Sequence, residues 1–179
     1  METFSAPRGF VKNSNYQMQK RESLRKLDFS IIDSPIIDIV RGFSRLNYCF
    51  TLQSCYGHFL YPAKRDPDNI EPLPFVNDIK SVEYRIAYLA ICIEDSIPGK
   101  ELFDNLGEIP SVDQEYIQFG SAGWFWERQL NSYALQVEPM RYMNRDRCRI
   151  DYAEALHVEQ IRNQFIEQLR TLLRKRLGE

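Results

Sequence analysis

Residues 47–61, NYCFTLQSCYGHFLY, place a thiol, a hydroxyl, a glycine and an imidazole between two aromatic, strand-like runs. The small residues before Gly57 break the first run, and aromatic sequence resumes at Phe59. This pattern predicts two strands joined by a tight turn that carries Cys55 and His58. Because backbone amides at such turns can face a ligand, we take this turn as the candidate site.

Helical segments precede the turn. Residues 1–15 are polar and without a period, which predicts a loose arm, and residues 16–27 have the composition of a short basic helix. Ser34 and Pro35 are a favourable helix start, since serine caps free amides and proline fits the first turn. Apolar residues at helical spacing then predict a helix over 35–46.

Strand-like segments dominate the middle of the chain. Residues 62–75 are rich in Pro, Asp and Asn and predict a long surface loop. Residues 83–94, EYRIAYLAICIE, are nearly continuous apolar sequence, as in a central strand buried on both faces. We further predict a short helix over 98–106, strands over 115–119 and 132–137, and strand or turn for GWFWERQ at 123–129.

The last segment has the clearest pattern. Asp151 and Glu154 have capping-box spacing, and a regular apolar stripe follows them, so a helix is predicted over 152–176. The stripe suits packing on the core better than contact with a partner helix. The order of elements predicts an α/β or α+β fold: a single domain over 16–179 with a mixed central sheet flanked by helices and a long C-terminal helix.

Composition is that of an ordinary soluble globular protein. The chain has 179 residues, 44% hydrophobic and 27% charged. Its cysteines lack paired spacing and are expected to be reduced thiols; they are Cys49, Cys55, Cys92 and Cys148. The first ten residues lack a signal-peptide pattern, and no apolar run approaches the ~20 residues that span a bilayer. We therefore expect a cytoplasmic protein without membrane contact.

The net charge of -2 removes the overall attraction expected of a generic nucleic-acid binder. Three local basic runs remain, around residues 20–26, 141–149 and 170–176. The third falls in the last turns of a predicted helix, where cations complement the helix dipole. Solvated faces are favoured for the other two.

Several chemistries suit the turn. The spacing of Cys55 and His58 suits zinc, but a structural site needs four ligands and the other candidates are scattered, so no metal is predicted. His58 could instead activate the Cys55 thiol, with the Gly57 amide stabilising an oxyanion. The turn could also line a ligand pocket with Ser54, Cys55 and the Gly57 backbone, or be purely structural, with Cys55 buried and His58 bonded locally.

A second candidate surface is aromatic. Trp124 and Trp126 flank Phe125 and precede Glu127 and Arg128, an arrangement that can stack on a base or another planar ligand. Packing in the core or at a sheet edge explains the same residues.

Residues 26–59, KLDFSIIDSPIIDIVRGFSRLNYCFTLQSCYGHF, resemble the start of the wybutosine-synthesising tRNA methyltransferases of the third pathway step. The matching residues are Asp28, Ser30, Asp33, Pro35, Ile36, Thr51, Ser54, Cys55 and Gly57, with His58 where that family usually has arginine. The segment QVEP at 136–139 is similar to the family's Glu-Pro strand.

The resemblance implies an α/β fold, S-adenosylmethionine as methyl donor and a tricyclic guanosine precursor in tRNA as substrate. On this basis the expected catalytic residues are Cys55 and His58, and the expected cofactor-binding residues are Thr51, Ser54 and Gly57. The residues expected to bind substrate are Asp28 and Asp33 from this segment, together with Trp124 and Trp126 from the aromatic segment.

We therefore expect a small-ligand or nucleotide-binding protein related to these methyltransferases, with S-adenosylmethionine-dependent RNA methylation as its reaction if it is an enzyme. The alternative is a non-enzymatic interaction or structural protein whose partner surface is the final helix or the basic runs. Thiol hydrolase or transferase chemistry through Cys55 is a third class.

Overall fold

A computed structural model of the chain describes residues 4–75, 78–142 and 145–179. It contains a five-stranded sheet in the order β1-β6-β7-β5-β2 and a three-stranded sheet in the order β3-β4-β8. The strands are β1 (Phe4–Ser5), β2 (Cys49–Cys55), β3 (His58–Leu60), β4 (Ser81–Arg85), β5 (Ala87–Ile93), β6 (Ile117–Ala122), β7 (Ser132–Val137) and β8 (Arg147–Asp151). Neighbouring strands in both sheets are antiparallel, so the predicted fold class resolves to α+β.

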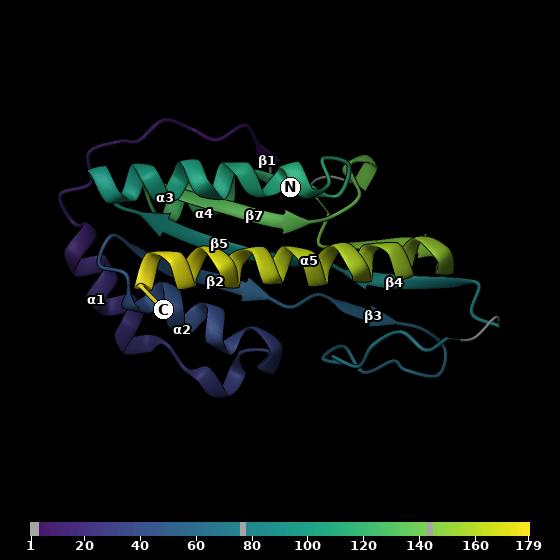
Figure 1. The fold of residues 1–179 in the computed structure, drawn as a ribbon. Helices are drawn as coiled ribbons and strands as arrows, with labels where there is room; N and C mark the ends of the chain where they lie inside the picture. The colour runs from purple at the N-terminus through teal and green to yellow at the C-terminus, as the bar shows by residue number, and fades with distance from the viewer. Residues whose placement is uncertain (1–3, 76–77, 143–144) are drawn as a thin grey trace.

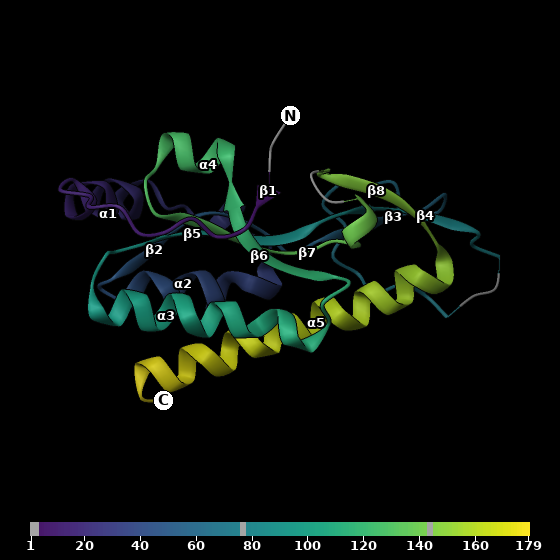
Figure 2. The same ribbon diagram turned by 90° about the horizontal axis from the view of Figure 1, so that it is seen from above.

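Helices cover both faces of the larger sheet. The α-helices are α1 (Tyr16–Lys26), α2 (Ile37–Arg45), α3 (Ile97–Glu108), α4 (Gly123–Arg128) and α5 (Tyr152–Leu177). Figures 1 and 2 show α2, α3 and α5 together on one side of the sheet and α4 on the other. Short 3-10 helices occur at Phe29–Ile31, Ser34–Ile36, Ile109–Val112 and Met140–Tyr142. Among the described residues, none of the helices is both long and apolar enough to cross a bilayer.

The long helix α5 connects the two sheets. Asp151 caps it, because its carboxylate accepts a hydrogen bond from the Glu154 amide at 2.8 Å, as the capping box predicts. The apolar stripe is buried against β7, β4 and β8, with Val158 and Phe165 among its core residues. The prediction that this helix packs on the core is therefore confirmed, and its apolar face is not available to a partner.

The predicted central strand over 83–94 is divided by a bend. β4 ends at Arg85 and pairs in the smaller sheet, whereas β5 begins at Ala87 and lies inside the larger one. The buried hydroxyl of Tyr84 accepts from the Ala87 amide and donates to the Val137 carbonyl, each at 2.9 Å. Because these contacts satisfy the backbone where the ladder is interrupted, the chain can change sheets without losing buried hydrogen bonds.

Two further predictions were wrong. From Phe4 onward the N-terminal arm is tied to the body, because β1 pairs with β6 and the Val11 amide donates to the Asn131 side chain at 2.8 Å; residues 1–3 lie outside the described part of the chain. GWFWERQ is neither strand nor turn but the short helix α4. The helices predicted over 16–27, 35–46 and 98–106, the strand predicted before the turn at Gly57 and the strands predicted over 115–119 and 132–137 are confirmed with small shifts in their ends.

Candidate functional site

The predicted strand, turn and strand are present, with β2 ending at Cys55 and β3 beginning at His58. Gly57 has φ +89°, in the left-handed region that glycine adopts readily. A Cβ atom built on it would lie 2.8 Å from the Cβ of Ala87. The Gly57 amide donates a hydrogen bond to the Cys55 sulfur at 3.4 Å. The turn thus requires glycine, and its amide is engaged by the thiol.

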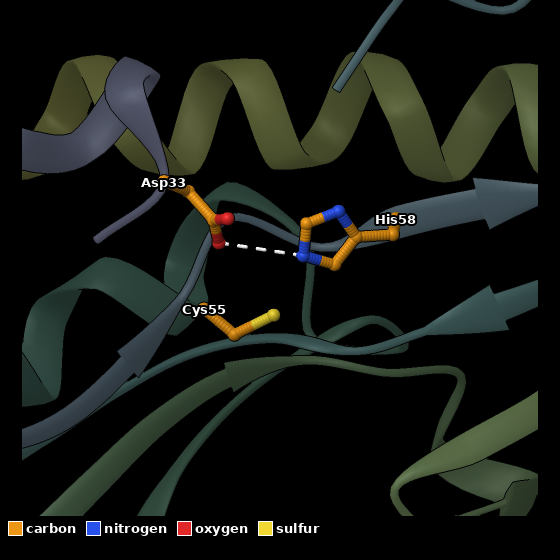
Figure 3. A group of neighbouring side chains, drawn as sticks. All are labelled: Asp33, Cys55 and His58. Carbon is orange, nitrogen blue, oxygen red and sulfur yellow. Dashed lines mark ion pairs between the residues drawn. The ribbon is translucent and has the colours of Figure 1, made fainter. Parts of the chain in front are cut away.

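A third polar group joins the turn from the start of the helical segment before α2. The Asp33 carboxylate accepts a hydrogen bond from the Tyr56 amide at 2.8 Å. Ser34, predicted as a helix cap, instead occupies the first position of the 3-10 helix, and neither it nor Asp33 caps that helix through its side chain. Asp33 is therefore directed to the turn, where Figure 3 shows it beside Cys55 and His58.

The His58 ring is almost fully buried between two acceptors. Its Nε2 lies 3.3 Å from Asp33 Oδ2, and its Nδ1 lies 3.1 Å from the Asn69 carbonyl oxygen. Hydrogen bonds with Asp33 and Cys55 outweigh burial and raise the pKa of His58 to about 10. Burial alone would raise the pKa of Asp33, but hydrogen bonds from His58 and the Tyr56 amide lower it. At neutral pH the pair is an imidazolium and a carboxylate.

These residues form part of the wall of an open cavity of about 620 Å³. This volume is within the range of small-molecule sites. The lining includes aromatic side chains from β1, β5 and α4 and arginines from β4, β8 and the segment before β8. The aromatic residues are Phe4, Tyr88, Trp124 and Phe125, and the arginines are Arg85, Arg145 and Arg147. The cavity therefore combines planar apolar surface with arginines, and its lining also includes four carboxylates: Asp33, Asp68, Glu138 and Asp146.

A buried polar network supports another part of the wall. The Gln136 side-chain amide donates to the side chains of Gln118 and Glu138, at 3.0 Å in each case. The Glu138 side chain also accepts from the Arg145 amide at 3.3 Å. Because its members bond one another, this part of the wall is preorganised rather than mobile.

Five of the nine predicted site residues line the cavity: Asp33, Ser54, Cys55, His58 and Trp124. The remaining four are not among its lining residues. Thr51 lies farther back on β2, and the Gly57 amide contacts the Cys55 sulfur. Asp28 is exposed and accepts hydrogen bonds from Ser30, and Trp126 packs edge-on against Tyr133 at 5.8 Å.

Sequence reasoning missed several lining residues, among them Arg85, Tyr88, Glu138 and Arg147. Arg147 belongs to a basic run that we interpreted as a solvated face. The sequence RCRID alternates between charged and apolar residues, which is the signal of a half-buried strand. Read in that way, the segment predicts β8 and places Arg147 on its open face.

The arrangement differs from that of a hydrolytic Cys-His-Asp triad. In such a triad the carboxylate and the nucleophile contact opposite nitrogens of the imidazole. Here Nδ1 faces the Asn69 carbonyl, and Figure 3 shows the carboxylate and the sulfur on the Nε2 side of the ring. The geometry therefore disfavours the thiol hydrolase class.

No protein-family model and no curated protein matches the chain. Among solved structures, the fold resembles that of PH1069 protein from Pyrococcus horikoshii, with a TM-score of 0.52 and 16% identity over 92% of this chain and 95% of that chain. A structure of PH1069 protein from Pyrococcus horikoshii OT3 aligns with a TM-score of 0.47 and 15% identity, covering 91% of this chain and 94% of that chain. At such low identity the first likeness shows a shared fold across nearly the whole chain.

Proposed function

We propose that the chain binds a small planar, anionic ligand of the nucleotide class in the cavity beside Asp33, Cys55 and His58. The observation that carries the proposal is the joint presence of aromatic rings and arginines around one cavity of suitable size. Aromatic faces stack on bases, and arginine pairs with phosphate or carboxylate.

The aromatic ring of Trp124 is accessible to a ligand. Trp124 is 47% exposed although it lines the cavity, and the Arg128 guanidinium lies 4.0 Å from its ring centroid. An exposed tryptophan ring braced in this way is preorganised to stack on a planar ligand.

The arginines are held in place by neighbouring acceptors. Arg85 donates to the Pro67 carbonyl at 2.9 Å, and Arg147 lies 3.4 Å from Glu83. Arg85 also lies 3.9 Å from Asp68. Each guanidinium carries five donors, so these contacts leave several N–H groups for a phosphate or carboxylate. Fixed charges that still have free donors suit an anionic ligand.

The resemblance to the wybutosine methyltransferases extends the proposal to S-adenosylmethionine as ligand and RNA methylation as reaction. This donor is cationic overall because of its sulfonium and ammonium groups, so its adenine ring and its carboxylate are the parts that suit the aromatic rings and arginines of the cavity. Asp33, Ser54 and Cys55, which carry that resemblance, line the cavity. His58 stands where the family usually has arginine, and its raised pKa of about 10 keeps a positive charge at this position. The substitution therefore keeps a positive charge here, but this charge is paired with Asp33 at 3.3 Å, so the arginines of the cavity are the groups that would hold a carboxylate or phosphate.

Thermal unfolding with and without S-adenosylmethionine tests this proposal. A ligand at 100 times its Kd that binds only the folded state adds about 2.7 kcal/mol. At about 2–4 °C per kcal/mol for a chain of this size, the midpoint should rise by roughly 5–11 °C. Ser54→Ala should reduce the rise, whereas Ser44→Ala, near the end of α2 and not among the residues that line the cavity, should leave it intact.

The control ligands separate binding from methyl transfer. A rise with adenosine monophosphate but none with S-adenosylmethionine would retain a nucleotide site and discard the methyl donor. No rise with either at millimolar concentration would contradict the proposal and favour the non-enzymatic interaction class. Methylation of tRNA is tested only after the donor is shown to bind.

A further inference from the structure

We propose that Asp33, Cys55 and His58 form a binding site for a divalent transition metal of the zinc class, with one coordination position open to the cavity. The carboxylate oxygen, thiol sulfur and imidazole nitrogen all lie within 4.8 Å of one another. All three donor types are ligands of zinc. The proposal is independent of the proposed function, because metal uptake requires no organic ligand.

The separation of the nitrogen and oxygen fits two ligands of one ion. His58 Nε2 and Asp33 Oδ2 are 3.3 Å apart. A charge-assisted N–H···O bond is usually about 2.7–2.9 Å long. Zn–N of about 2.0–2.1 Å and Zn–O of about 2.0–2.2 Å at a tetrahedral angle place the two atoms about 3.3–3.5 Å apart. The observed separation is long for a hydrogen bond of this kind, and a metal ion could replace the Nε2 proton with little movement of either side chain.

The sulfur needs only a small adjustment. With Zn–S of about 2.3 Å, a tetrahedral site places sulfur about 3.5 Å from its neighbouring ligand atoms. Cys55 Sγ lies no farther than 4.8 Å from either of the other two atoms. A side-chain movement of about 1 Å therefore closes the site, and Cys55 is only half-buried, at the end of β2.

The imidazole is oriented for coordination through Nε2. The Asn69 carbonyl can only accept, so Nδ1 carries a proton and donates to it at 3.1 Å. A ring nitrogen that donates to a backbone carbonyl while the other nitrogen binds the metal is the usual arrangement of a ligating histidine. Asn69 is itself buried, and its side-chain amide donates to the Phe59 carbonyl at 3.3 Å.

The other two ligands are held by backbone amides of the same turn. The Tyr56 amide donates to Asp33 Oδ2 at 2.8 Å, and the Gly57 amide donates to Cys55 Sγ at 3.4 Å. Such outer hydrogen bonds fix the ligands and tune their basicity. Hydrogen bonds with backbone groups thus hold all three candidate ligands. Polar side chains that cluster by chance need no such support.

The charge of the three ligands and their access to solvent also favour a bound metal ion. A thiolate and a carboxylate beside a neutral imidazole place two negative charges in a half-buried group, which a dication neutralises. In the metal-free protein the proton on His58 Nε2 supplies positive charge at the position that the ion would take. All three residues line the cavity, so a fourth ligand can enter from solvent. Three protein ligands with one open position are typical of catalytic rather than structural zinc.

The test uses the intact chain after treatment with a chelator, titrated with Co²⁺ and with Zn²⁺ in the absence of any nucleotide. We expect one equivalent of either ion to bind and Co²⁺ to give a thiolate charge-transfer band. Cys55→Ser should abolish the band, whereas Cys148→Ser, which alters a buried thiol on β8, should retain it. Asp33→Asn and His58→Gln should each weaken Zn²⁺ binding by at least about tenfold.

A matched control has the same residue types without a thiol. His157 Nε2 lies 3.7 Å from Asp113 Oδ2 on the surface, so His157→Gln should leave Zn²⁺ affinity unchanged. The proposal fails if the wild-type chain shows no thiolate band with Co²⁺, whatever the variants do. It fails equally if folded Cys55→Ser, verified by circular dichroism, binds Zn²⁺ as tightly as wild type. Binding of S-adenosylmethionine to the metal-free chain is measured in a separate titration, so the two proposals can fail independently.

Discussion

The buried guanidinium of Arg162 on α5 donates a hydrogen bond to the Gly57 carbonyl at 3.0 Å, so the long helix holds the turn that carries the candidate site. The same guanidinium lies 4.0 Å from the ring centroid of Tyr56 and pairs with Glu159 at 3.4 Å. The position of Cys55 and His58 therefore depends on packing against a helix far along the chain.

Removing this charge should destabilise the fold and loosen the turn. Arg162→Met keeps much of the side-chain volume but leaves the Gly57 carbonyl without this donor and Glu159 with the Leu73 amide alone, so we expect a loss of about 3 kcal/mol. Urea unfolding measures it. Arg174→Met, on an exposed position of the same helix, should change stability by less than about 0.5 kcal/mol. Equal losses in the two variants would contradict the anchoring role.

Gly57→Ala should be costly for two separable reasons. The left-handed backbone and the clash with Ala87 together predict a loss of about 2–4 kcal/mol. Adding Ala87→Gly removes the contact with the Ala87 Cβ but leaves the contacts with the Ala87 N and Cα, at 3.0 and 3.1 Å, and the backbone strain, so the double variant should recover only part of the loss. Gly9→Ala has nothing within 4 Å of the new Cβ and serves as control. Full recovery in the double variant would exclude backbone strain as a cause.

Trp124→Ala should weaken ligand binding without affecting stability. Stacking of a base on an aromatic ring contributes about 1–3 kcal/mol, which corresponds to a roughly 5- to 150-fold rise in Kd. Isothermal titration with S-adenosylmethionine or adenosine monophosphate measures it. Trp126→Phe, which retains a ring against Tyr133 outside the cavity, should bind as wild type. A larger effect of Trp126→Phe than of Trp124→Ala would move the ligand away from this cavity.

Local patterns predicted most elements and the turn that carries Cys55 and His58, but not the arginines of the cavity or the contact between Asp33 and the turn. Gly57 and the capping Asp151 act on their own neighbours, so their structural roles can be read from a few residues. Asp33 reaches the turn only because the segment before α2 packs beside β2 and β3, and no spacing encodes that contact. The bend at Ile86 could not be predicted for a similar reason. A run of apolar residues has the same sequence pattern whether its strand stays in one sheet or passes from one sheet to another.

Stability at low pH should depend on the pair formed by Asp38 and Arg170, whose Nε lies 2.7 Å from Asp38 Oδ2. Burial alone would raise the pKa of Asp38, but the hydrogen bond and charge of Arg170 lower it. The pair therefore stabilises the fold above the unfolded pKa of about 3.9, and this contribution is lost as pH falls through the lower folded value.

The pair is largely exposed, so Asp38→Asn should cost only about 0.2–1 kcal/mol at pH 7. The gap from wild type should narrow below about pH 4. Arg170→Gln should show the same pH dependence, and the double variant should lose less than the sum of the two single losses. Strict additivity in this cycle would show that the two groups do not interact.

Alkylation should distinguish Cys55 from the other thiols. Burial raises the pKa of Cys49, Cys92 and Cys148 to about 12 in each case, so their thiolates are scarce at neutral pH as well as shielded. Cys55 is half-buried and lines the cavity. Intact mass after brief treatment of the folded chain should therefore show one adduct, and Cys55→Ser should show none. Four adducts are expected once the chain is unfolded. Slower labelling of the folded chain in the presence of Zn²⁺ would indicate that the metal binds the Cys55 thiol. Several adducts on the folded wild type would mean that the reagent reaches the other thiols through local opening of the fold. Exposure to the cavity would then not explain a selective reaction of Cys55.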